Sequence, residues 1–293
     1  MSQVRNSLVR ARAFLLLCFF AAPLAGRADD VYFVTYSHNM EERGNLEIAP
    51  NLVLGVPRVA NRYLANWTEL EYGVTGWWTS EFYLEGQKTF HDSTILTGLR
   101  WENRFRPLAD EHWINPVIYV EFEDISDADK AIKEVVGFDS RGDLIGANSE
   151  LRTVRNHEIE TKLILGSNHR GWNISGNFIA EKNLANEPWE FGYAVGASRP
   201  LRLAASSQDC HLCRENFTAG MELYGGLGTW NQTTLHGTSH YAAPVVAWDA
   251  GKGVTLRVSP TFGLNGNSIP YLLRVGLSYE IPRFDRQLRR WFR

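Results

Sequence analysis

Long hydrophobic runs are missing from nearly all of the 293-residue sequence. After residue 25 no segment approaches about 18 uninterrupted apolar residues, which excludes membrane-spanning helices. An excess of basic charge is missing too, because the formal net charge is −3, and this argues against nucleic acid as a partner. No Pro/Ser/Gly-rich linker or low-complexity tract divides the chain, so we expect one domain.

The one apolar run lies at the amino terminus and has the features of a secretory signal. Three arginines, the last of them Arg12, precede the uncharged stretch 13–25, and a small-x-small cleavage site ends at Ala28. The run is too short for a transmembrane helix, which needs about 20 residues. We predict cleavage after Ala28, which leaves 26 basic against 33 acidic residues and a formal charge of −7.

Apolar and polar residues alternate through the rest of the chain, as in strands whose two faces meet different surroundings. In the first such segment Ile48 and Leu52 fall on one face, and Glu47 and Asn51 fall on the other. Twelve segments show the pattern: 45–54, 67–74, 77–87, 95–106, 118–123, 158–165, 172–181, 189–195, 217–228, 241–249, 254–264 and 271–281. The chain is therefore predicted to be all-β.

Two further features favour a membrane barrel over a soluble β-sandwich, which also alternates. Aromatic residues gather toward strand ends, as interfacial girdles require: Trp78, Trp101, Phe105, Trp172, Trp189, Tyr271 and Tyr279. The connections 73–76, 167–171 and 249–253 are tight and fall on one side of the predicted strand order. Short turns on one side and longer loops on the other are typical of a barrel whose termini lie in the periplasm.

Local resemblances agree with this fold. The stretch 274–281 (RVGLSYEI) resembles the terminal-strand signal of outer-membrane barrels, although residues 282–293 follow it. The segments 69–87 (ELEYGVTGWWTSEFYLEGQ) and 101–108 (WENRFRPL) look like those of a functionally uncharacterised family of bacterial outer-membrane β-barrel proteins. The resemblance implies the fold and names no activity.

The inward face of such a barrel carries charge, because an arginine or lysine facing lipid costs about 2–4 kcal/mol near the midplane. The predicted lumen residues are Glu69, Glu71, Glu81, Glu85, Arg100, Glu102, Arg104, Glu121, Glu123, Glu158 and Glu160. They form an acidic, basic and acidic stripe around the wall. This predicts either a charged constriction that favours cations or a cross-strand ion-pair network that fills a narrow barrel.

Three segments outside the strands have open interpretations. Ser126 and Asp129 are spaced like the cap of a short helix inside the long gap 124–151, which could gate the mouth or form a solvated loop. Residues 31–36 could add a strand or a luminal plug. The basic tail 282–293 carries arginines and apolar residues at helical spacing. It is predicted either to lie on the anionic inner-leaflet surface or to be disordered.

Cysteine is scarce, and two of the three cysteines form a Cys-x-x-Cys pair, Cys210 and Cys213. A metal site usually needs four ligands, and haem attachment needs His after the second Cys, where this chain has Arg214. An oxidising compartment favours a small disulfide loop, and a redox role is the alternative. We expect no metal and no cofactor.

One motif suggests an enzyme. His91-Asp92-Ser93 and the later Asn103 resemble the His-x-Ser and Asn of the outer-membrane phospholipase A family, itself a twelve-stranded barrel. The resemblance implies Ser93 as nucleophile, His91 as base and Asn103 as the residue that orients it. The alternative is a polar hairpin turn, because Asn103 lies about 26 Å along the strand that follows.

We therefore predict a transmembrane antiparallel up-and-down β-barrel of about twelve strands over 29–281, in the outer membrane of a Gram-negative bacterium. The expected partners are membrane lipids, the barrel-assembly machinery and small solutes. The preferred function is a porin-like channel. A phospholipase-like hydrolase and a structural barrel with a plugged lumen are the alternatives.

Overall fold

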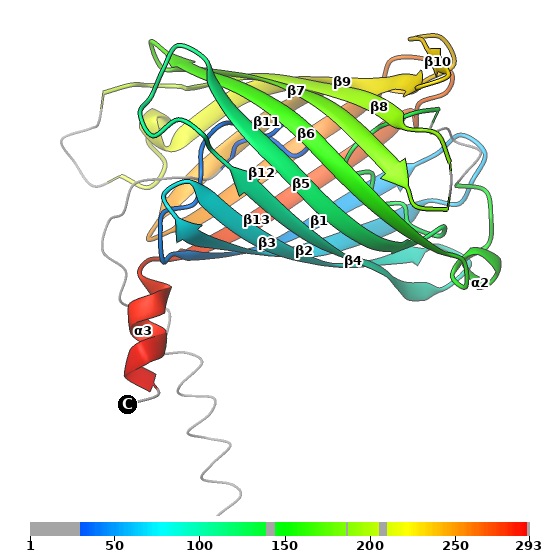
Figure 1. Cartoon of the computed structure of the whole chain (residues 1–293), viewed down its shortest axis with the longest axis horizontal. Coiled ribbons are helices and arrows are strands. Elements are labelled where there is room, and N and C mark those ends of the chain that lie inside the picture. Colours follow the sequence, from blue (N-terminus) through cyan, green and yellow to red (C-terminus); the bar gives the residue numbers. More distant parts are fainter. Residues whose placement is uncertain (1–29, 139–143, 186, 205–209, 292–293) are drawn as a thin grey trace, which may run out of the picture.

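Twelve long antiparallel strands close into a barrel in the computed structural model (Figure 1). The model describes residues 30–138, 144–185, 187–204 and 210–291, so the predicted signal peptide, 1–28, lies outside the described residues. The strands are β1 (Leu46–Val56), β2 (Tyr63–Thr75), β3 (Trp78–Thr89), β4 (Thr94–Phe105), β5 (Asn115–Ser126), β6 (Arg155–His169), β7 (Trp172–Asn183), β8 (Glu190–Pro200), β9 (Phe217–Thr229), β11 (His240–Gly251), β12 (Val254–Gly263) and β13 (Tyr271–Ile281).

Each long strand pairs with its neighbours along the chain, and β13 pairs with β1 to close the sheet. A two-residue strand, β10 (Gln232–Thr233), extends the end of β9. Among the described residues, three short helices lie outside the wall: α2 (Asn148–Leu151), η1 (Arg214–Asn216) and α3 (Phe284–Trp291). The predicted all-β, up-and-down topology is confirmed.

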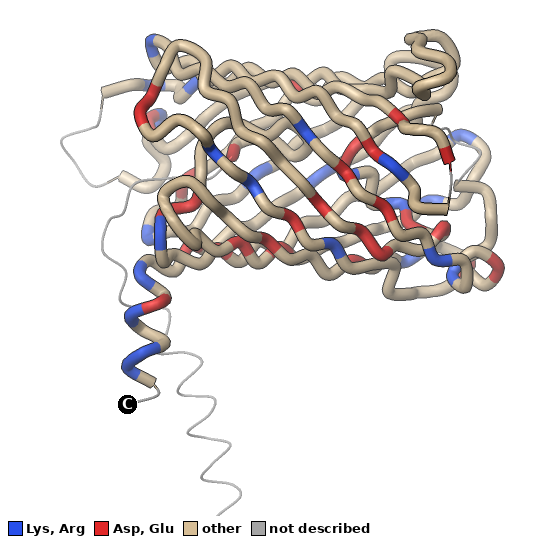
Figure 2. Tube along the Cα trace, in the orientation of Figure 1, with Lys and Arg blue, Asp and Glu red and all other residues tan. Residues whose placement is uncertain are grey.

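The barrel is polar inside and apolar outside. Leu52, Leu99 and Phe178 are about half exposed on the outer surface, whereas Glu85 and Arg100 on the inner surface are buried. Charged positions are spaced along the strands of the wall (Figure 2). A soluble protein would lose stability by exposing this much apolar surface, so the outer surface is suited to lipid.

Tight turns join the strands at the end of the barrel that carries both termini. β6 is joined to β7 through Arg170 and Gly171, and both residues have positive φ. Two successive residues with positive φ match the right-handed twist of a two-residue hairpin. Lys252 and Gly253 do the same between β11 and β12. The predicted short connections are confirmed.

Aromatic residues cluster at the end of the wall that carries the termini. Trp77, Trp78 and Phe105 contact one another there, with ring centroids 6.1–6.4 Å apart. Trp101, expected near a strand end, instead stacks on Phe82 further along the wall.

A bulge in β4 interrupts the alternation. Glu85 pairs with Gly98 and Gly86 pairs with Leu96, so that Thr97 is an extra residue. Leu96 is 73% exposed as a result, where strict alternation would place Ile95 outside.

Two segments enter the barrel and fill its middle. The amino-terminal segment, 30–44, enters from the end that carries the termini and contains the buried residues Tyr32, Val34 and His38. Residues 31–36 thus form a luminal plug and add no strand. The inserted loop, 127–137, enters from the opposite end and buries Lys133 and Val135. No helix in the described part of the chain is long and apolar enough to cross a membrane.

The helix expected after Ser126 does not form. Ser126 and Asp129 instead hydrogen-bond the backbone N–H groups two residues later, Ala128 at 3.1 Å and Ala131 at 3.1 Å. The segment stays irregular because its backbone bonds the wall of the barrel. The N–H of Gly137 donates to the carbonyl of Phe191 at 3.1 Å.

Candidate functional site

The inner surface gathers all eleven charged residues expected there. Nine of them are buried, and Glu69 and Glu71 are partly exposed and border a small internal cavity. Strands β2 to β6 present these side chains inward because alternate residues of a strand point to the same face. The lumen is therefore densely charged, and its geometry depends on how these charges pair.

Arg100 on β4 is the centre of one charge cluster. Its guanidinium lies 3.0 Å from Glu85 on β3, and 3.2 Å and 2.6 Å from Glu121 and Glu123 on β5. A fourth carboxylate, Glu134 of the inserted loop, lies 2.6 Å away. One cation held by four acids from three elements joins the loop to the wall.

Arg104, four residues further along β4, is the centre of a second cluster. It contacts Glu71 on β2, Glu81 on β3 at 3.6 Å and Glu102 at 2.9 Å. Glu102 also accepts the hydroxyl of Tyr36 from the amino-terminal segment at 3.1 Å. The Arg100 cluster thus holds the inserted loop, and the Arg104 cluster holds the amino-terminal segment.

The inserted loop supplies functional groups that the sequence analysis missed. The Lys133 ammonium lies 3.2 Å from the centroid of the Tyr83 ring and 3.7 Å from Glu121. Burial alone would raise the pKa of Glu134, but Arg100 and the lysines nearby lower it to about 2. Glu134 is therefore ionised. The available signal was the placement of Lys130, Lys133 and Glu134 among the apolar residues of 131–136.

Strands β9 and β12, on the side of the barrel opposite β2 to β6, also hold the amino-terminal segment. The carboxylate of Glu222 on β9 accepts three consecutive backbone N–H groups, from Phe33, Val34 and Thr35, at 3.0, 2.9 and 2.8 Å. The guanidinium of Arg257 on β12 donates to the carbonyls of Asp30 and Tyr32 at 2.8 and 3.1 Å. These residues also escaped the sequence analysis.

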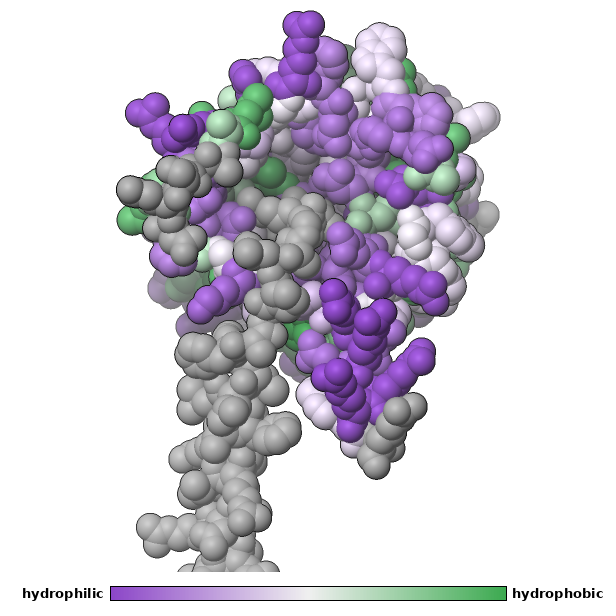
Figure 3. Space-filling model, turned by 90° about the vertical axis from the view of Figure 1, so that its left-hand side faces the viewer, coloured by the Kyte–Doolittle hydropathy of each residue, from purple (hydrophilic) through white to green (hydrophobic). Residues whose placement is uncertain are grey.

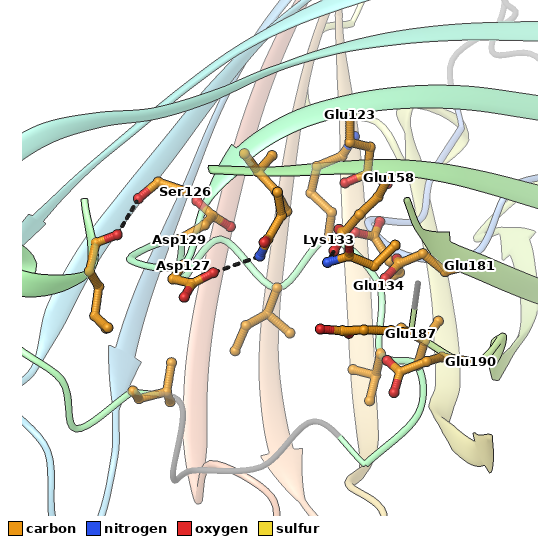
Figure 4. Close-up of a pocket in the computed structure, with 18 of the residues that line it drawn as sticks. Glu123, Ser126, Asp127, Asp129, Lys133, Glu134, Glu158, Glu181, Glu187 and Glu190 are labelled. Carbon is orange, nitrogen blue, oxygen red and sulfur yellow. Dashed lines mark hydrogen bonds between the residues drawn. The ribbon is translucent and has the colours of Figure 1, made fainter. Parts of the chain in front are cut away.

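Cavities remain in the described part of the barrel beside these segments, and two of them border the charge clusters. The larger, about 950 Å³, lies at the end opposite the termini and is here called the acidic vestibule (Figure 4). Its acidic lining residues are Glu123, Asp127, Asp129, Glu134, Glu158, Glu181, Glu187 and Glu190. The basic ones are Arg100, Lys133 and Arg155. The smaller cavity, about 50 Å³, surrounds Arg104 and Tyr36.

Three carboxylates that line the vestibule and a fourth, Glu160, approach one another. One oxygen from each of Glu123, Glu134, Glu160 and Glu181 lies within 4.8 Å of the others. An all-oxygen donor set of this kind suits a hard cation such as Ca²⁺. Protein cations already share it, because Lys162 lies 2.8 Å from Glu160 and Arg100 pairs with Glu123.

The structure does not bring His91, Ser93 and Asn103 together. His91 lies exposed in the turn between β3 and β4, and the amide of Asn148 donates to the Ser93 hydroxyl at 3.1 Å. Asn103 lies near the other end of β4, roughly 30 Å along the strand. There it accepts a hydrogen bond from the indole of Trp78 at 3.0 Å.

Cys210 and Cys213 form a disulfide at the end of the barrel that carries the termini. The loop around them is tied to the wall, because the Trp248 indole on β11 donates to the carbonyl of His211 at 2.8 Å. The side chain of Asn216 donates to the carbonyl of Cys210 at 2.7 Å. This connection between β8 and β9 is long although it lies on the side of the short turns.

Comparison with solved structures identifies outer-membrane barrels as similar folds. The COG4313 outer membrane channel from Pseudomonas putida F1 aligns over 88% of this chain and 100% of its own, with a TM-score of 0.55 at 10% identity. A KdgM porin aligns over 80% and 98%, with a TM-score of 0.50 at 9% identity. No family model and no curated protein matches the sequence. The chain thus has the fold of an outer-membrane β-barrel.

Proposed function

We propose that this protein is a narrow outer-membrane channel for small solutes that favours cations. The observation that carries the proposal is the acidic vestibule, a cavity of about 950 Å³ at one mouth of a closed barrel. A cleft lined by charge of one sign concentrates counter-ions and raises their rate of entry. The two barrels of similar fold, a channel and a porin by name, support the same function.

The selectivity follows from the excess of acidic over basic residues in the vestibule lining, eight against three. Arg100 and Lys133 are shared among acids at the base of the vestibule. Glu187 and Glu190 lie apart from this group and nearer the mouth (Figure 4). A ring of carboxylates at a mouth attracts cations and repels anions.

The filled middle of the barrel supports a second candidate, a structural barrel with a plugged lumen. The inserted loop lines the vestibule, the amino-terminal segment lines the small cavity near Arg104, and both have buried residues in the middle of the barrel. A continuous path then requires one of them to move. The two candidates differ in one measurable property, the passage of ions.

Conductance in planar bilayers tests the proposal. We expect discrete openings from the purified protein and a reversal potential that shows cation preference in a KCl gradient. The triple variant Glu181→Gln, Glu187→Gln and Glu190→Gln should lose most of that preference. Asp110→Asn, an exposed acid at the opposite end, is the matched control and should leave it unchanged. A silent bilayer with folded protein would contradict the channel and favour the plugged barrel.

Export to the outer membrane is part of the same proposal. The signal sequence predicted over 1–28 and the lipid-suited outer surface support it. Amino-terminal sequencing of protein purified from outer membranes should begin at Asp29. Recovery of the intact amino terminus would contradict cleavage after Ala28.

A further inference from the structure

Helix α3 is fixed to the rim of the barrel at its first turn. After β13 ends, Arg283 takes a positive φ of 51° and turns the chain out of the wall. The N–H of Arg283 donates to the Asn45 side chain at 2.9 Å, and the N–H of Asp285 donates to the carbonyl of Gly44 at 3.2 Å. A β-carbon at Gly44 would lie 2.9 Å from the Asp285 carboxylate. The start of β1 and the end of β13 thus set the direction of α3.

That direction leads sideways, away from the barrel wall. Figure 1 shows that α3 starts at the end that carries the termini and extends transverse to the long axis of the barrel. In the view onto that end, α3 projects beyond the outline of the barrel (Figure 3). Both views place the helix outside the barrel at the level of this rim. In a membrane-embedded barrel this is the plane of the lipid headgroups.

The residues of α3 are sorted into two faces. Phe284, Leu288 and Trp291 follow the i, i+4, i+7 spacing of one helical stripe, and Arg286 and Arg289 fall on the other side. Leu288 and Trp291 are 38% and 57% exposed, and no residue of the helix is buried. The side that faces the viewer in Figure 3 is strongly hydrophilic. Phe284 is partly buried at the rim, whereas the rest of the apolar stripe, Leu288 and Trp291, is open to the surroundings.

We propose that α3 binds the anionic phospholipid surface of the leaflet at this end of the barrel. An interfacial helix lies in the membrane plane with its apolar face among the acyl chains and its basic face among the headgroups. The direction, the stripe and the arginines of α3 satisfy these three conditions together. The cluster of Trp77, Trp78 and Phe105 at the same end of the wall marks the interface level independently.

The proposal goes beyond channel function and does not depend on it. A barrel that conducts nothing would still present α3 to lipid. The helix would fix the depth and tilt of the barrel in the bilayer. Because each arginine near an anionic surface contributes about 1 kcal/mol, each one removed should lower the bound-to-free ratio of α3 about fivefold.

Spin labels on the full mature chain in vesicles test the proposal. Leu288→Cys carries a label on the apolar stripe, and Arg286→Cys carries one on the opposite face as the matched control. Cys210 and Cys213 do not interfere because they are joined to each other. In phosphatidylcholine vesicles containing phosphatidylglycerol, the label at 288 should be accessible to oxygen and shielded from a water-soluble nickel reagent. The label at 286 should remain accessible to nickel.

Three results would overturn the proposal. The first is a water-exposed label at 288 in the anionic vesicles. The second is equal shielding in vesicles of phosphatidylcholine alone, which would remove the role of charge. The third is release of α3 by inorganic phosphate at constant ionic strength, which would indicate a site for the free anion. Replacing Arg286, Arg289 and Arg290 by Gln should expose the label at 288, and the folded migration of the barrel on a gel should persist.

Discussion

Single buried carboxylates hold the amino-terminal segment in the barrel. Glu222 is the clearest case, because one side chain accepts three consecutive backbone N–H groups. The segment runs inside the barrel and forms no strand with the wall. These N–H groups therefore have no carbonyl groups of a paired strand to bond. Buried N–H groups left without acceptors would cost stability. The Glu222 carboxylate therefore supplies the hydrogen-bond acceptors that a neighbouring strand would otherwise provide.

The variant Glu222→Gln should loosen the segment. The neutral amide offers one acceptor oxygen in place of two charged ones, and hydrogen bonds to charged groups contribute about 1.5–3 kcal/mol each. We expect faster amide hydrogen exchange at Phe33, Val34 and Thr35, with the strands unchanged. Glu150→Gln, an exposed acid on α2, is the control. Unaltered exchange at the three amides would contradict the role of Glu222.

Glu41 gives the same segment a pH dependence. Burial, with Glu71 and Glu280 nearby, raises the pKa of Glu41 from 4.5 to about 8. Between pH 4.5 and about 8, Glu41 is therefore protonated in the docked segment and ionised in the released segment. Release of the segment in this range is coupled to loss of the proton. Docking should be strongest below that value and weaken as the pH rises to about 8.

Proteolysis across pH measures this effect. Cleavage within 30–44 by a protease active over the whole range should increase between pH 5 and pH 9. In Glu41→Gln the side chain stays neutral, so the increase should be much smaller. Full pH dependence in that variant would assign the effect to another group, such as Asp30, whose pKa burial also raises.

At the scale of elements, inward-facing glycines make room for the two inserted segments. A β-carbon at Gly192 on β8 would lie 2.3 Å from the carbonyl oxygen of Val135 in the inserted loop. One at Gly196 would lie 2.7 Å from the Tyr32 ring, and one at Gly166 would lie 2.1 Å from the His38 ring. The wall is therefore shaped around segments that enter it from both ends.

The variant Gly192→Ala should displace the inserted loop. The new methyl group meets backbone, which cannot rotate away, and overpacking of this kind costs about 1–3 kcal/mol. We expect faster hydrogen exchange over 130–137 and, if the barrel conducts, larger currents. Gly176→Ala on β7 is the matched control, since no atom lies within 4 Å of its added carbon. Equal hydrogen exchange over 130–137 in the two variants would contradict a close fit between Gly192 and the inserted loop.

At the scale of the molecule, the closed sheet leaves no long strand without two neighbours among the described residues. A closed sheet satisfies its backbone groups internally and resists detergent. Unheated protein in sodium dodecyl sulfate should therefore migrate faster than boiled protein on a gel. Identical migration of the two samples would contradict a closed barrel.

The sequence by itself determined the wall. A period-two pattern fixes which face of each strand is apolar, so the twelve strands and the inward set from Glu69 to Glu160 could be read from local spacing. The bulge at Thr97 was missed because it depends on the pairing of β3 with β4.

Only the tertiary structure decided what fills the lumen. The residues that hold the inserted segments, such as Glu222 with Val34, are distant in sequence and share no local pattern. Ser126 and Asp129 have a capping pattern, but contacts of the following loop with β8 and Arg100 outweigh the helical preference. Local periodicity reports the environment of each face, whereas the fit between segments depends on where the closed barrel places them.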